Sequence, residues 1–392
     1  MNKLENLKSK FPFFVNNPGI TYLDSAATTH KPNSVIKIVN DYYCKNNANA
    51  GRGIYSQSLK LENDVEDVRE KVANFINAKI DNIIFTSGAT SGIEQISNLL
   101  LPLFNDGDEI IFSPFDHKSL IQPWHRTQQV ARNFGQVIKL VPYSYKESGE
   151  ANLPEIRNFV SNKTRIIATT QLHNIYGEIT DVAQLKGHTQ DALVCLDATQ
   201  SVSHGILDVE DLGADITVFS GHKMFASQGV GVIALSDRAK AVLSRSARIL
   251  SSETLRSTLE SGTQNWAGIL SLKPAIEFIE ELGSNNIHKH LAYLTQLIVQ
   301  GLRNFKKVEF TKGPANWRCA DGYGIVSFNV AGLEPSELGF ILNEQNICVR
   351  SGDHCNFNKK EQSVRVSLQV YNDEEDIQRF LNVLTKLLHH RN

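Results

Sequence analysis

The sequence predicts an α/β protein with a large domain around a mostly parallel sheet and a smaller α+β domain after it. Between residues 83 and 220, short apolar segments rich in β-branched residues alternate with helix-length segments, as in parallel sheets buried on both faces. Beyond residue 265 two long helical patterns replace this alternation. We therefore expect an N-terminal segment, 1–19, that packs with the small domain, a large domain, 20–265, and a small domain, 266–392.

The composition excludes several function classes. The formal net charge is -2, which does not suggest a nucleic-acid partner or an anionic membrane surface. We find no secretory signal and no apolar run long enough to span a membrane. The cysteines are odd in number and form no C-x-x-C pair, so we expect neither a disulfide framework nor a metal site, and a cytoplasmic protein.

The N-terminal part of the large domain is expected to begin with a strand. Residues 20–24 (ITYLD) fit a short strand, and small residues follow at 25–27. After Pro32 a helical pattern places four apolar residues on one face: Val35, Ile36, Val39 and Tyr43. A polar loop around 51–58 precedes an amphipathic helix over 59–76, with apolar residues at Leu61, Val65, Val68, Val72 and Phe75.

The sheet itself is predicted from six apolar segments of the large domain. They cover residues 83–86, 109–113, 137–143, 164–172, 192–197 and 214–220. In the small domain, helices are expected over 269–282 and 287–305, strands within 323–330, 347–352 and 364–371, and a last helix from residue 374. Ligands of such a protein should collect at the carboxyl ends of the parallel strands.

An acid and a lysine follow two neighbouring strands of this sheet. Asp197 ends one strand, and Lys223 follows the next in the sequence Ser-Gly-His-Lys. A lysine amine can form a Schiff base with pyridoxal phosphate (PLP), and a carboxylate can keep the pyridine nitrogen protonated. The alternative is a solvated surface lysine, so these two residues do not establish a PLP site without their context.

A glycine-containing turn from Ser87 to Gly92 lies between a strand and a helix. Free N–H groups and the helix dipole would suit a phosphate there, with Thr90 adding a hydroxyl. An ordinary strand-to-helix turn with an N-cap explains the same residues. The turn lacks the lysine of a P-loop, which argues against nucleoside triphosphates.

Two polar side chains follow other strands of the sheet. His117, beyond the strand 109–113, could stack on a flat cofactor and move protons, although histidines at such positions also serve as structural hydrogen-bonding residues. Asn174, in the sequence HNIYG, could bond a cofactor oxygen, and turn formation would explain it nearly as well.

Two residues of the small domain are candidates for contacts with the substrate. Arg365 lies in an alternating strand and would suit a bidentate grip on a carboxylate, unless it faces solvent. Cys355 lies in a polar loop beside His354, where we expect an exposed and reactive thiol, whereas Cys195 and Cys348 lie in apolar runs that suit packing.

Together these motifs resemble the class V aminotransferases, which are fold-type-I PLP enzymes, and within them the cysteine desulfurase and selenocysteine lyase branch. The resemblance covers nearly the whole chain. It rests on YLDSAATTHKP, ANAGRGIYSQS, FTSGATSGIE, DHK, HNIYG, LDATQSV, SGHKM, SGTQN, VRSGDHC and VRVSLQVYN. The SGHK motif after LDATQ is specific for the PLP group, and R-S-G-x-H-C is typical of the desulfurase branch.

The resemblance implies a role for each matching residue. Lys223 would form the Schiff base, Asp197 would pair with the pyridine nitrogen, and His117 would stack on the ring. Arg365 would bind the substrate carboxylate. The remaining residues would bind the ring oxygen (Asn174 and Gln200), the phosphate (Ala89, Thr90, Ser220 and His222), and the phosphate of the neighbouring subunit of a homodimer (Thr263).

For the reaction, the resemblance implies that Cys355 receives sulfur from L-cysteine as a persulfide while alanine leaves, before a sulfur-acceptor protein takes the sulfur. Two segments depart from the family pattern, the glycine-free stretch within 241–260 and the short loop 356–364. The alternatives are another class V reaction in which Cys355 is incidental (an aminotransferase, epimerase or β-lyase), and a catalytically silent scaffold protein. The preference for cysteine or selenocysteine stays open.

Overall fold

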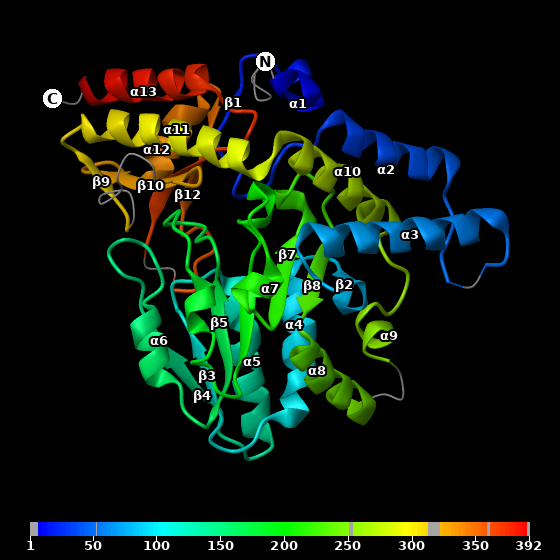
Figure 1. The fold of residues 1–392 in the computed structure, drawn as a ribbon. Coiled ribbons are helices and arrows are strands. Elements are labelled where there is room, and N and C mark those ends of the chain that lie inside the picture. The colour runs from blue at the N-terminus through cyan, green and yellow to red at the C-terminus, as the bar shows by residue number, and fades with distance from the viewer. Residues whose placement is uncertain (1–6, 52, 251–253, 313–321, 359–360, 390–392) are drawn as a thin grey trace.

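The central sheet of the computed structural model contains seven strands (Figure 1). The structure describes residues 7–51, 53–250, 254–312, 322–358 and 361–389. The strands run in the order β2-β8-β7-β6-β5-β3-β4. Their bounds are β2 Ile83–Thr86, β3 Glu109–Phe112, β4 Lys139–Pro142, β5 Thr164–Thr170, β6 Leu193–Asp197, β7 Ile216–Ser220 and β8 Gly231–Leu235.

The prediction of a mostly parallel sheet is confirmed. Strands β3 to β7 pair in parallel, whereas β8 runs antiparallel to both β2 and β7. β8 was not predicted. It follows Lys223 after a connection too short for the crossover helix that a parallel strand would require.

Helices cover both faces of this sheet. Successive strand residues point to opposite sides, and apolar residues on both sides need to be buried. On β2, Ile84 packs into the core under one set of helices, and Phe85 packs into the core on the other face. The first set is α4 Ala89–Leu100, α5 Lys118–Asn133 and α8 Asp237–Leu250. The second face is covered mainly by α3 Ser56–Phe75 and α10 Trp266–Leu282, with α6 Leu153–Phe159 farther along the sheet.

Helix α2 Asn33–Lys45 forms where it was predicted, but its buried face is different. Val35 and Tyr42 are buried, whereas Ile36 is 46% exposed and Tyr43 61% exposed. Positions 35, 38, 39 and 42 form the stripe that packs inward, and Ile36 and Tyr43 lie on the neighbouring stripe. The prediction that Ile36 and Tyr43 share the buried face was therefore wrong.

A second, antiparallel sheet lies at the top of Figure 1, in the order β12-β13-β10-β9. Its strands are β9 Val308–Phe310, β10 Ile325–Val330, β12 Arg350–Gly352 and β13 Ser363–Ser367. The helices of this region are α11 Ser284–Arg303, α12 Pro335–Asn343 and α13 Glu374–His389. Helix α10 begins at Trp266 because the Asn265 side chain accepts a hydrogen bond from the Gly268 N–H (3.0 Å).

The N-terminal residues join this C-terminal region. Strand β1 Thr21–Tyr22 pairs in parallel with β11 Ile347–Cys348. Before it, α1 Pro12–Asn16 follows Phe11, whose ring lies 5.0 Å from that of Tyr371. Strand β1, expected in the large domain, thus pairs with a strand of the C-terminal region. The domain limits given above remain predictions.

The α-helices not yet named are two short ones, α7 Val209–Leu212 and α9 Leu255–Leu259. Cys319, residues 1–6 and parts of the segments 241–260 and 356–364 lie outside the described residues. Within the described ranges, none of the helices is both long and apolar enough to cross a membrane.

Candidate active site

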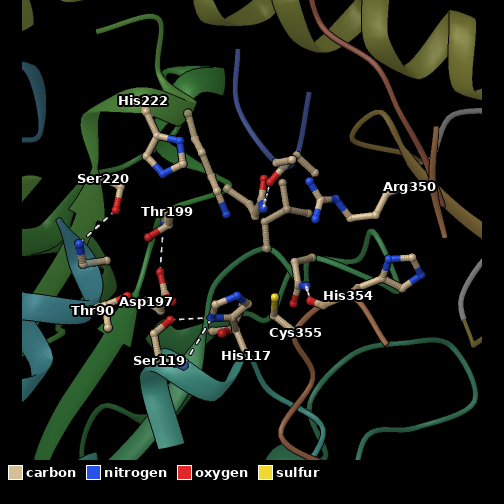
Figure 2. A pocket seen from close by; sticks show the side chains of 18 of the residues that line it. Thr90, His117, Ser119, Asp197, Thr199, Ser220, His222, Arg350, His354 and Cys355 are labelled. Carbon is tan, nitrogen blue, oxygen red and sulfur yellow. Dashed lines mark hydrogen bonds between the residues drawn. The ribbon is translucent and has the colours of Figure 1, made fainter. Parts of the chain in front are cut away.

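A cavity of about 220 Å³ lies at the carboxyl ends of β5, β6 and β7 (Figure 2). Eleven of the twelve site residues predicted from the sequence line it: Ala89, Thr90, His117, Asn174, Asp197, Gln200, Ser220, His222, Lys223, Cys355 and Arg365. Thr263 does not line it; this residue is exposed in the segment between α9 and α10.

Asp197 is the last residue of β6, so its carboxylate reaches the sheet edge. The side chain is buried, and its Oδ1 accepts a hydrogen bond from the Thr199 N–H at 2.9 Å. The Thr199 hydroxyl lines the same cavity and is buried without a hydrogen-bond partner among the described residues. A buried carboxylate and an unpaired hydroxyl side by side are suited to a polar ligand.

Lys223 ends a single 3-10 turn, Gly221–Lys223, that follows β7. Gly221 is needed in this turn, since a Cβ there would lie 2.7 Å from Val230 Cγ1. Burial, together with the nearby charge of Arg365, lowers the pKa of the Lys223 amine to about 8. A larger fraction of this amine than of an ordinary lysine is therefore neutral and nucleophilic near neutral pH.

The segment before α2 holds the backbone next to Lys223. The carbonyl of His222 accepts hydrogen bonds from the hydroxyls of Thr28 and Thr29 (3.1 Å each) and from the Lys31 amine (3.0 Å). The Thr29 N–H adds a contact of 3.0 Å. The peptide from which Lys223 projects is thus fixed on the side that faces residues 28–31.

The N-terminus of α4 forms one end of the cavity. The Ala89 N–H donates to Ser220 Oγ at 2.9 Å, which joins the helix start to the end of β7. Gly88, at φ +158, brings its backbone against Gly231, where an added Cβ would lie 2.6 Å from Gly88 Cα. The first N–H groups of a helix lack intrahelical partners, so this end suits an anion, with the Thr90 hydroxyl beside it.

His117 precedes α5 and caps it. Its Nδ1 accepts a hydrogen bond from the Ser119 N–H (3.2 Å) and contacts the Ser119 hydroxyl. Burial and the charge of Lys223 lower the pKa of His117 to about 3, so the ring is neutral at physiological pH. The residue therefore both caps a helix and presents a neutral ring to the cavity.

Asn174 is held by a turn that His173 organises. The His173 Nδ1 accepts hydrogen bonds from the N–H groups of Ile175 and Tyr176 (3.2 Å each), and its Nε2 donates to the Phe115 carbonyl (3.1 Å). Gly177 closes the turn at φ 71. Asn174 is buried, and its Nδ2 donates to the His354 carbonyl at 3.2 Å.

The opposite end of the cavity contains two arginines that share one carboxylate. Arg350 and Arg365 lie directly opposite each other on β12 and β13. Asp24 accepts hydrogen bonds from both, at 3.1 Å from Arg350 Nη2 and 3.2 Å from Arg365 Nη2. This carboxylate offsets the repulsion of two like charges paired across the strands.

The two arginines differ in exposure. The side chain of Arg365 is 3% exposed and that of Arg350 41% exposed. Arg365 also donates to the Asn174 carbonyl at 3.0 Å, and its buried Nε has no hydrogen-bond partner among the described residues. A guanidinium with an unused donor at a cavity is suited to bind a ligand carboxylate.

Cys355 lies beside His117 in Figure 2, at the end of the cavity away from Thr90 and Ser220. The residue is half-buried, not exposed as the sequence suggested. Its carbonyl accepts a hydrogen bond from the Lys118 N–H at 2.9 Å. Its own N–H donates to Asp353 Oδ1 at 3.0 Å. The backbone of Cys355 is therefore held at the cavity from two sides.

Some residues of the site were missed in the sequence. Asp24, Arg350 and Ser119 were not singled out, although the first two lie within the family motifs quoted above. Their contacts depend on pairing between β12 and β13 and on the position of the residues after β1. The available indication was a charged residue at each of two short strands, Asp24 after β1 and Arg350 at the start of β12.

The residues present fit PLP. An anion site, a carboxylate and a lysine of lowered pKa line one cavity with the neutral ring of His117. The Thr199 hydroxyl and Arg365 Nε add two buried hydrogen-bond donors that have no acceptor among the described residues. This donor set matches the phosphate, pyridine nitrogen and aldehyde of PLP and a substrate carboxylate.

The chain is similar to known proteins over nearly its whole length. The family model Aminotransferase class-V matches residues 21–380, a range that includes every residue lining the cavity. The chain is similar to a protein of Halalkalibacterium halodurans named "Probable cysteine desulfurase" (32% identity, 97% of both chains). It is also similar to the "Cysteine desulfurase" of Pectobacterium atrosepticum (30% identity, 98% of both). The apo structure of the cysteine desulfurase from Thermococcus onnurineus NA1 covers 98% of both chains with a TM-score of 0.88 and 28% identity.

Proposed function

This chain belongs to the class V aminotransferase family, and from that premise we propose that it is a PLP-dependent cysteine desulfurase. It converts L-cysteine to L-alanine and retains the sulfur as a persulfide on Cys355. The observation that carries the proposal is the position of Cys355, half-buried at the same cavity as Lys223 and Asp197. A thiol at that place can reach the side chain of a bound amino acid.

The cofactor would be held by groups from one edge of the large sheet. The start of α4, Thr90, Ser220 and His222 would bind the phosphate, and Asp197 would pair with the pyridine nitrogen. Asn174 and Gln200 would bond the ring oxygen, with His117 against the ring and Lys223 bound to the aldehyde. When bound, PLP acts as an electron sink for the bonds around the amino acid's α-carbon.

The substrate would be oriented by its carboxylate. Arg365 offers buried donors, and Arg350 shares Asp24 with it. Because Asp24 neutralises one of the two positive charges, one net positive charge remains for the substrate carboxylate. This arrangement would place the substrate's side chain toward Cys355.

The thiol of Cys355 would attack the sulfur of the bound L-cysteine. A sulfur–sulfur bond forms while the carbon–sulfur bond of the substrate breaks. Overall, L-cysteine and the Cys355 thiol yield L-alanine and a Cys355 persulfide, so atoms and electrons balance. His117 lines the same cavity beside Cys355, so it would be placed to move a proton there during the reaction.

We also infer a homodimer, a sulfur-acceptor protein and a cytoplasmic location. Beside the phosphate end, a second hollow is lined by Ser87, Glu94 and Gln228 together with Thr90 and Ser220. Thr263 is exposed, so that of a neighbouring subunit would be free to enter this hollow, in the role expected from the family motif. Cys44, Cys195, Cys348 and Cys355 are free thiols, in keeping with a reducing compartment.

The test is the release of alanine from L-cysteine by the holoenzyme and by Cys355→Ala. The proposal predicts that the variant retains bound PLP and loses nearly all alanine formation in the presence of a sulfur acceptor. Undiminished turnover in Cys355→Ala would overturn it. Keto-acid-dependent amino transfer by that variant would instead indicate an aminotransferase.

A further inference from the structure

The turn that carries Cys355 has a strained backbone. We call residues 353–356 the thiol turn. His354 and Cys355 are consecutive non-glycine residues with φ 50 and φ 59. The left-handed region is unfavourable for residues with a Cβ, so such a conformation persists only where surrounding contacts hold it.

Contacts from three sides hold the thiol turn. Cys355 receives a hydrogen bond from the Lys118 N–H, and the His354 Nε2 contacts Ser363 Oγ at 2.8 Å. The third side is Asn174, whose Nδ2 donates to the His354 carbonyl at 3.2 Å. This contact bonds the peptide that joins the two strained residues.

Asn174 connects this turn with the rest of the site. Its own carbonyl accepts a hydrogen bond from Arg365 Nη1 at 3.0 Å, and its side chain lines the cavity. The residue is 6% exposed, and the His173 turn fixes its backbone. An amide nitrogen carries two N–H groups, so one can bond His354 while the other remains for a ligand in the cavity.

We propose that Asn174 is a positioning residue for sulfur transfer, whose amide holds the thiol turn at the cavity and joins it to the site of the bound cofactor. This role goes beyond contact with a cofactor oxygen and rests on the proposed function. Loss of the amide leaves the strained peptide of the turn without one of its contacts. The Cys355 thiol then samples positions away from the substrate and becomes more accessible to solvent reagents.

The test compares Asn174→Ala with Gln200→Ala, both as holoenzyme. Gln200 lines the same cavity, but its Nε2 donates to the Ala26 carbonyl (2.9 Å) and not to the thiol turn. The measurement is the rate of Cys355 alkylation by iodoacetamide, followed by mass spectrometry of the peptide that contains Cys355. Following that peptide separates Cys355 from the exposed Cys44.

We expect alkylation of Cys355 to become about fivefold faster in Asn174→Ala, as the loss of one hydrogen bond would produce. Gln200→Ala should react at the wild-type rate. Equal rates in Asn174→Ala and wild type, or the same increase in Gln200→Ala, would overturn the inference. If Asn174→Ala does not yield folded holoenzyme, Asn174→Asp replaces it, because an ionised carboxylate cannot donate to the His354 carbonyl.

This readout separates the inference from the proposed function. Alkylation is measured without substrate, so it does not depend on desulfuration. Faster Cys355 alkylation in Asn174→Ala, together with no alanine from the wild-type enzyme, would contradict the proposed desulfurase reaction and leave the role of Asn174 standing. Normal alanine release with unchanged alkylation would contradict only the role of Asn174.

Discussion

The two ends of the cavity come from different parts of the molecule. The cofactor end, which contains Ala89, Asp197, Ser220 and Lys223, is built at one edge of a single sheet. The thiol end contains Asp24, Arg350, Cys355 and Arg365, and Asp24 is 341 residues from Arg365 in sequence. In Figure 2 Asp197 and Ser220 lie on one side of the pocket, and Arg350 and Cys355 lie on the other.

The forces that hold the two ends differ as well. At the cofactor end, strand ends and a helix start place the functional groups, and packed apolar side chains lie behind them. At the thiol end, the paired strands β12 and β13 carry the arginines. Side-chain hydrogen bonds join the groups of this end: Asp24 accepts from both arginines, and Asn174 donates to the His354 carbonyl. We therefore expect substitutions at the thiol end to impair substrate use and leave cofactor binding intact.

The largest effect is expected from Lys223→Ala. Without the amine no covalent bond to PLP can form, and activity should fall by at least about 10³-fold. Borohydride reduction should attach PLP to the wild-type chain and not to this variant. Fixation of PLP on another lysine, for example Lys31, would break the assignment of the cofactor end.

Arg365→Lys tests the independence of the thiol end. A lysine keeps the charge but loses the planar fork that binds a carboxylate, so kcat/KM for L-cysteine should fall about 100-fold. The absorption of bound PLP should stay at its wild-type intensity. A loss of cofactor in parallel with activity would contradict the separation of the two ends.

Asp24→Asn should act mainly on stability. The carboxylate accepts from the buried Arg365, so its removal leaves that charge without its counterion. We expect the free energy of unfolding to fall by about 3 kcal/mol, measured by denaturant titration. Asp41→Asn, at an exposed ion pair of α2, is the control and should change it by less than about 1 kcal/mol.

The smallest effect is a pH dependence at the cofactor end. The pKa of Lys223 is lowered to about 8, and the neutral amine is the reactive form. Below that pH, the rate at which the apoprotein takes up PLP covalently should rise about tenfold per pH unit, and it should level off above it. A rate that keeps rising toward pH 10.5, the ordinary lysine value, would show that burial does not affect this amine.

The cofactor end could largely be predicted from the sequence, and the thiol end only in part. Asp197 ends one apolar segment and Lys223 follows the next, and the β-branched residues of both segments predict neighbouring strands. The two side chains were therefore expected at the same edge of the sheet. Asp24 follows β1 and Arg350 begins β12, which are strands of two and three residues. Such strands are too short for periodicity to predict their pairing.

Two further differences have physical causes. The strand β8 was missed because it is antiparallel and closely follows Lys223, outside the alternation of strands and helices. On α2, Ile36 and Tyr43 have helical spacing but lie beside the stripe that packs inward. Apolar spacing alone does not decide which of two adjacent stripes is buried.

The most direct test of the account is the location of sulfur after one turnover. Holoenzyme is mixed with one equivalent of L-cysteine, unreacted thiols are blocked, and the cysteine-containing peptides are weighed by mass spectrometry. The account predicts one additional sulfur atom on the peptide with Cys355, together with an equal amount of alanine. Alanine formed without sulfur on Cys355, or with the sulfur on Cys44 or Cys348, would contradict it.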